Sequence, residues 1–118
     1  MMSSMSELAF QRARSAEAKQ ARERAILDAA RALGRRSGVR DVTLTDIAAA
    51  VGMHKSALLR YFETREQIFL ELTAEEWRQW SAELCGDLAG RPHATPAEVA
   101  EVIARTLAAR PMFCDLLA

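Results

Sequence analysis

Residues 43–62 read TLTDIAAAVGMHKSALLRYF, and this stretch decides the fold. Its apolar spacing predicts two short helices that meet at Gly52, the first of which buries Ile47, Ala48 and Val51. The second helix is expected to bury Leu58 and Phe62 and to turn five residues outward, namely Lys55, Ser56, Leu59, Arg60 and Tyr61. Two helices joined in this way are typical of a helix-turn-helix that enters a DNA major groove, although a generic helical hairpin shows the same apolar spacing.

The composition of the 118-residue chain favours an all-α protein. Half of its residues are hydrophobic, alanine is abundant, and no stretch alternates apolar and polar residues with a period of two. With only three prolines and five glycines, disorder of the whole chain is not expected. A chain of this length forms one domain, or one domain and part of a second, around a modest core.

Charge is distributed unevenly along the chain, although the net charge is zero. Residues 11–65 carry twelve basic and six acidic side chains, a net charge of +6, whereas residues 66–118 carry four and nine, a net charge of −5. A basic first half and an acidic second half suit a nucleic-acid-binding head and a body that does not touch DNA. The alternative is that solvated helix faces differ by chance.

The cysteine and histidine spacing predicts neither a metal site nor a cofactor. Cys85 and Cys114 form no CxxC pattern, and His54 and His93 complete no set of metal ligands. Both cysteines lie in apolar helical patterns, so we expect buried, reduced thiols.

Catalysis and membrane insertion also lack a sequence signal. Glu75 and Glu76 are interpreted as a solvated helix face, and no nucleophile, base or paired-carboxylate arrangement supports an enzyme. No apolar run reaches the roughly 18 residues of a membrane span, and the N-terminus lacks a signal-peptide core. We therefore expect a cytoplasmic protein that does not enter a membrane.

A long first helix is predicted after a flexible polar arm over residues 1–14. The helix is expected to run from about Ser15 to Arg36 and to end at Gly38, a natural left-handed residue. Its apolar face follows helical spacing through Ala18, Ala21 or Ala25, Ile26, Ala29, Ala30 and Leu33.

Capping signals divide the rest of the chain. Thr43 with Asp46, and Thr64 with Gln67, form capping boxes for the second and fourth helices, while the third begins near His54. The fourth helix is expected to continue through Leu88. A fifth helix is predicted from an N-cap threonine, a proline and a glutamate, and it stops before a second proline; these are Thr95, Pro96, Glu98 and Pro111.

Residues 24–72 resemble the DNA-binding head of the TetR family of transcriptional regulators. The matching pieces, at the family's spacing, are Ile26-Leu27-Asp28-Ala29-Ala30, Gly38, Thr43, Asp46-Ile47-Ala48, Val51-Gly52, Lys55-Ser56-Ala57-Leu58, Tyr61-Phe62 and Thr64-Arg65-Glu66. The resemblance implies a three-helix DNA-binding head over residues 15–63, a long connecting helix, and a helical effector-binding and dimerisation body. Because family members are usually longer, the body over residues 64–118 is expected to be truncated.

The same resemblance implies a sequence-specific repressor. Such a protein binds a palindromic double-stranded DNA operator as a homodimer and is released by a small-molecule effector. The alternative is a helical protein-interaction module of the same fold without specific DNA binding.

DNA contacts are expected from ten residues, namely Thr43, Thr45, His54, Lys55, Ser56, Ala57, Leu59, Arg60, Tyr61 and Arg65. Lys55 can reach a guanine edge or a phosphate, and Arg60 and Tyr61 suit phosphates at the groove lip. Tyr61 can instead pack against the first helix. Arg14, Lys19 and Arg22 either add general attraction for DNA or form a solvated face.

Three positions depart from the family pattern. His54 stands where a serine usually caps the third helix, which costs about 1 kcal/mol or leaves His54 to contact DNA. Leu59 replaces a tyrosine that meets phosphate, and both of these changes favour the interaction-module alternative. Gly34 stands where an aromatic residue often follows the leucine, so it fills less of the core of the head.

A possible effector pocket is expected where the body begins. Its candidate lining residues are Trp77, Trp80, Met112 and Phe113. The alternative is that these aromatic and apolar residues belong to the core.

Overall fold

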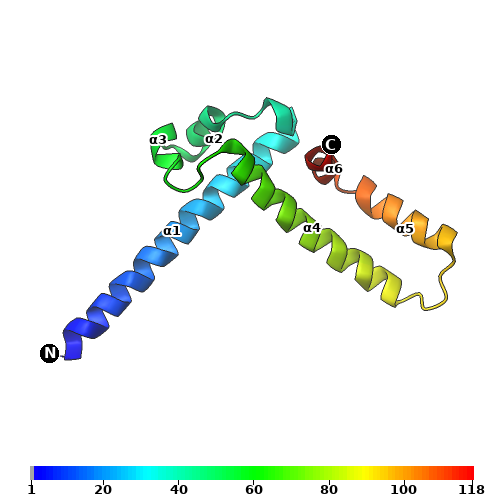
Figure 1. The fold of residues 1–118 in the computed structure, drawn as a ribbon, viewed down its shortest axis with the longest axis horizontal. Coiled ribbons are helices and arrows are strands. Elements are labelled where there is room, and N and C mark those ends of the chain that lie inside the picture. Colours follow the sequence, from blue (N-terminus) through cyan, green and yellow to red (C-terminus); the bar gives the residue numbers. More distant parts are fainter. Residues whose placement is uncertain (1) are drawn as a thin grey trace.

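The computed structural model describes residues 2–118, with side chains from residue 4 onward, and this part of the chain contains no strand. Its elements are α1 (Met2–Ser37), η1 (Val39–Asp41), α2 (Leu44–Val51), α3 (Lys55–Leu58), α4 (Arg65–Ala89), α5 (Pro96–Ala108) and α6 (Pro111–Leu117). Figure 1 shows α2 and α3 beside the C-terminal half of α1, with α4 leading away from them and α5 returning alongside it. The all-α fold with a long connecting helix is confirmed.

Helix α1 begins at Met2, so the prediction that a helix starts near Ser15 was wrong. Residues 2–14 contain neither glycine nor proline, and nothing in them interrupts a helix. The alanines expected on the apolar face at 18, 21 and 25 are exposed, and burial begins at Ile26. The first half of α1 therefore projects beyond the head (Figure 1).

The head has its core where α1, α2 and α3 meet. Ile47, Ala48, Leu58 and Phe62 are buried there, as predicted, and Val51 packs against them while partly exposed. Ile26 from α1 completes the contact. The burial of this apolar set against α1 is what fixes the two short helices in place.

Two glycines provide the turns that the head requires. Gly52 has φ 76° and ψ 35°, a left-handed conformation that ends α2, and its N–H donates to the carbonyl of Ala49 at 3.1 Å. Gly38 also has the expected positive φ of 86°, but its ψ of 143° lies outside the left-handed helical region. The chain leaves α1 there in an extended direction and enters η1.

The predicted caps are confirmed, with one shift. Thr43 and Asp46 form a complete capping box, because each side chain accepts from the other residue's N–H. Thr64 accepts from the N–H of Gln67, whose own side chain accepts from the N–H of Glu63 rather than that of Thr64. Thr95 caps α5 as predicted.

The body packs α5 and α6 against α4. Val102 is buried from α5, and Met112 and Phe113 are buried from α6. In Figure 1, α6 returns to the C-terminal end of α1, so the last described helix touches both the head and the body.

Cys85 and Cys114 are exposed, so the expected burial of both thiols was wrong. Cys114 nevertheless donates from its thiol to the carbonyl of Leu107 in α5, at 3.4 Å.

Candidate nucleic-acid interface

The outer side of α3 is short and open to solvent. Lys55 and Ser56 are exposed, Ala57 is half-buried, and the helix ends at Leu58 rather than continuing to Phe62. The chain then forms a turn in which the N–H groups of Arg60 and Tyr61 donate to Ala57 and Leu58. Helix α3 with this turn presents a compact polar surface beside α2.

The ends of α2 and α3 differ in how they are capped. His54 precedes α3 without a side-chain hydrogen bond to the helix, which confirms that it caps poorly. Thr43 uses its oxygen to accept from Asp46, and its hydroxyl hydrogen is left for another acceptor. Thr45 is exposed in the first turn of α2. Thr43 and Thr45 thus offer hydroxyl groups at a helix N-terminus, where anions are favoured.

Arg65 makes its contacts within the protein. Its guanidinium donates to the carbonyl of Val42 at 2.5 Å and to that of Val39, and it lies 4.6 Å from the centroid of the Phe69 ring. These bonds tie the start of α4 to the segment that precedes α2. The predicted phosphate contact of Arg65 stays a prediction, and these internal bonds oppose it.

Leu59 and Tyr61 occupy different environments in the turn after α3. Leu59 is 40% exposed and offers an apolar surface to solvent. Tyr61 is half-buried against the core of the head, which favours the packing interpretation for its ring. The buried ring does not prevent the hydroxyl from binding a partner, because a tyrosine can bury its ring and keep its hydroxyl exposed to solvent.

Basic side chains are used differently in the head and in the body. Arg91, Arg105 and Arg110 in the body each pair with a carboxylate. The cations that form no ion pair with any described residue lie almost entirely before residue 61; they are Arg12, Arg14, Lys19, Arg22, Arg35, Arg36, Arg40, Lys55 and Arg60, together with Arg78 in the body. The head therefore has positive charge available for an anionic partner.

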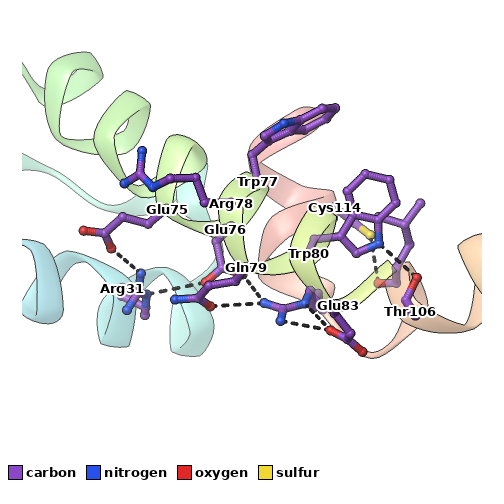
Figure 2. A network of polar contacts seen from close by, with 12 residues as sticks. Arg31, Glu75, Glu76, Trp77, Arg78, Gln79, Trp80, Glu83, Thr106 and Cys114 are labelled. Atoms are coloured by element: carbon purple, nitrogen blue, oxygen red, sulfur yellow. Dashed lines mark hydrogen bonds and ion pairs between the residues drawn. The ribbon is translucent and has the colours of Figure 1, made fainter. Parts of the chain in front are cut away.

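An ion-pair network joins the head to the body (Figure 2). Arg31 of α1 donates to Glu75 of α4 at 2.7 Å and lies 3.7 Å from Glu76. Arg110, which precedes α6, donates to Glu76 at 3.0 Å and to Glu83 at 3.1 Å. Glu76 is only 4% exposed, so the interpretation of Glu75 and Glu76 as a solvated face was wrong. Two arginines from different elements compensate its buried charge.

The network shifts the acid–base behaviour of its outer members. A hydrogen bond from Arg24 holds the pKa of Glu75 below its ordinary value, although partial burial opposes the shift. Burial alone would lower the pKa of Arg110, but the hydrogen bonds that it donates to Glu83 and Glu76 raise it overall. Both groups are therefore charged at neutral pH.

A cleft of about 700 Å³ lies at the same junction. Its walls come from the end of α1, from α4 and from the start of α6, and it is lined by Gly34, Arg35, Gly38, Glu76, Glu83, Ala109, Arg110, Pro111, Met112, Phe113 and Asp115. Two of the predicted effector residues, Met112 and Phe113, are thus brought together in it.

The burial of Glu76 has a signal in the sequence, because Glu76 continues the four-residue spacing of Ile68 and Leu72 on the buried side of α4.

Trp77 and Trp80 do not line the cleft. Their rings stack edge to face with centroids 5.5 Å apart, and Trp80 lies 5.9 Å from Phe113. The indole N–H of Trp80 donates to the hydroxyl of Thr106 at 2.9 Å, which fixes the ring between α4 and α5. The tryptophans therefore form an aromatic cluster behind Phe113, although Trp77 is 52% exposed.

Comparison with known families decides the class of protein. The family model described as bacterial regulatory proteins, TetR family, matches residues 26–72, and that of the tetracyclin repressor-like C-terminal domain matches residues 74–118. The chain belongs to the TetR family. The comparison with individual curated proteins finds no match.

Family membership gives the chain its biochemical class. This TetR family chain is a DNA-binding transcriptional regulator, and the segment matched by the first model contains α2, α3 and the start of α4. The second match covers most of α4 together with α5 and α6. None of the described helices is long and apolar enough to cross a membrane.

Proposed function

We propose that this regulator is a repressor that binds a palindromic operator as a homodimer and is released by a small-molecule effector. Each protomer places α3 and the turn after it in a major groove, and the two recognition helices lie about 34–36 Å apart. The acidic body stays away from the DNA.

One observation carries the DNA-binding part of this proposal. Lys55 and Arg60 are exposed on α3 and the following turn, and neither forms an ion pair with a described residue. Lys55 then contacts a guanine edge or a phosphate, and Arg60 contacts a phosphate at the groove lip. The small side chains of Ser56 and Ala57 allow the backbone of α3 to approach the bases.

The remaining candidate residues have supporting roles. The hydroxyls of Thr43 and Thr45 lie at the N-terminus of α2, where backbone N–H groups and the helix dipole favour a phosphate. Leu59 supplies an apolar contact that suits thymine methyl groups. His54, which makes no capping bond, is free to donate to the DNA.

Substitution of the two cations tests this assignment. Lys55→Ala and Arg60→Ala should each weaken binding to operator DNA about tenfold, because each removes a charged contact worth about 1–3 kcal/mol. Arg78→Ala is the matched control, since it removes an exposed, unpaired arginine from α4, and it should change affinity little. Circular dichroism should show equal helicity in all three variants. Unaltered affinity in both head variants would refute the placement of α3 in the groove.

The junction cleft supports the effector part of the proposal. Both the head and the body line it, so a ligand bound there lies against Gly38 of the head and Arg110 of the body, while Met112 and Phe113, which are 6% and 0% exposed, lie beneath its surface. The side chain of Asp115 in α6 also accepts from the N–H of Val39 at 2.8 Å, directly behind the segment that leads to α2.

Such a ligand acts by shifting a population of conformations. Glu76 holds Arg31 of the head and Arg110 of the body at the same time. A ligand that binds better when these contacts rearrange favours a second orientation of the head relative to α4. In a dimer, that change alters the spacing of the two recognition helices and weakens operator binding.

A further inference from the structure

A second concave surface lies on the head, between α1 and the turn that follows α3. This groove has a volume of about 490 Å³ and is lined by Ser15, Ala18, Lys19, Arg22, Arg60 and Tyr61. Four of these residues come from the part of α1 that projects toward its N-terminus, before burial begins at Ile26.

Apart from one alanine, the groove is lined by basic and hydroxyl-bearing side chains. Its lining contains three cations and two hydroxyl groups but no carboxylate. Lys19, Arg22 and Arg60 form no ion pair with any described residue, so their charge is not neutralised within this part of the protein. Arg14 lies one turn before Ala18 and is not part of the groove. Its guanidinium instead lies 5.4 Å from the centroid of the Phe10 ring. Unpaired cations around a concavity favour an anion.

Helical spacing explains why the groove forms on α1. Positions 15, 18, 19 and 22 follow the i, i+3, i+4, i+7 series, so Ser15, Lys19 and Arg22 share one face of the helix. Ala18 lies among them with a short side chain, which leaves room for a ligand close to the backbone. Arg60 and Tyr61 form the opposite wall.

We propose that this groove binds a phosphodiester of the DNA backbone, outside the major groove that α3 enters. Lys19 and Arg22 supply the charge from α1, Arg60 supplies it from the turn, and the hydroxyls of Ser15 and Tyr61 donate to phosphate oxygens. The site rests on the proposed function, because Arg60 and Tyr61 belong to both surfaces and one duplex must reach both. The exposed part of α1 thereby extends the footprint of the protein along the DNA.

The salt dependence of DNA binding tests whether this groove contacts a phosphate. Each phosphate contact releases counterions and contributes about 0.9 to the slope of the logarithm of the binding constant against the logarithm of the salt concentration. A double variant, Lys19→Ala with Arg22→Ala, should therefore flatten the slope by about one to two for each head. Its preferred DNA sequence should not change, because backbone contacts position the protein without reading bases.

The matched control is the double variant Arg36→Ala with Arg78→Ala. It removes the same charge at two exposed positions, in the last turn of α1 and in α4, and neither residue lines the groove or the junction cleft. Arg36 lies roughly 20 Å along α1 from Arg22, beyond the Debye length of about 10 Å at 0.1 M salt. The control should keep the wild-type slope.

Binding of the 118-residue chain and of both double variants to one duplex should be measured over a series of salt concentrations. A flatter slope in the Lys19/Arg22 variant alone supports the groove. A wild-type slope in that variant, or equal flattening in both variants, would overturn it while leaving DNA binding intact. Wild-type protein that binds no duplex even at low salt would instead refute the proposed function, and the groove with it.

Discussion

At the scale of single residues, Gly52 determines how α2 and α3 meet. Its φ of 76° lies in the left-handed region, which costs other residues about 1–2 kcal/mol. No heavy atom lies within 4 Å of the position that a Cβ would occupy, so the requirement for glycine is conformational and not a matter of space. Gly86, in the interior of α4, has equally open surroundings but no positive φ.

The two glycines should respond in opposite directions to the same substitution. Gly52→Ala should lower the free energy of unfolding by about 1–2 kcal/mol, because alanine is strained at this φ. Gly86→Ala should raise it by about 0.5–1 kcal/mol, because alanine loses less backbone entropy in a helix. Denaturant unfolding monitored by circular dichroism measures both values. Equal effects at the two positions would show that the turn does not need its left-handed glycine.

At the scale of elements, the capping signals of the sequence were the most reliable guide. Thr43, Thr64 and Thr95 each accept from the N–H three residues later, and α2, α4 and α5 begin after them. Such caps are local, so a single sequence is enough to find them. The predicted start of α1 was wrong because residues 2–14 carry no local signal that starts or stops a helix.

The candidate site could be predicted less completely, because its geometry depends on distant residues. The exposure of Lys55, Ser56 and Arg60 follows from helical spacing. The role of Arg65 depends on two carbonyls more than twenty residues earlier in the chain, and the burial of Glu76 depends on arginines from α1 and from the residue before α6. No local pattern indicates such partners.

The contact between α1 and α4 should be sensitive to acid. Because the pKa of Glu75 is lowered in the folded protein, its stabilising effect is complete above the ordinary glutamate value of about 4.3 and is lost as the pH falls toward the lower folded value. Glu75→Gln should therefore reduce stability at neutral pH by roughly 1 kcal/mol, with a flatter loss of stability below about pH 5.

Unfolding experiments between neutral and acidic pH measure this effect. Glu71→Gln is the control, since Glu71 lies exposed on the same helix and forms no ion pair with a described residue. That variant should follow the wild-type pH dependence. If Glu75→Gln also follows it, the hydrogen bonds from Arg24 and Arg31 do not stabilise the junction.

At the scale of the whole molecule, charge pairing separates the two halves more clearly than net charge does. The carboxylates of α4 neutralise arginines from α1, from α5 and from the residue before α6, and these pairs join α4 to the head and to the rest of the body. The cations of the head that face away from this junction have no such partners. The zero net charge of the chain therefore conceals one surface whose positive charge is available to an anionic partner.

The central claim is that this surface reads a specific DNA sequence, and selection from a pool of random duplexes at moderate salt tests it most directly. We predict enrichment of a palindrome whose half-sites lie about one helical turn apart, as expected for two copies of α3 related by a two-fold axis. Retention of duplexes without any enriched sequence would contradict the claim, because it would leave only phosphate contacts and no reading of bases by Lys55 and its neighbours.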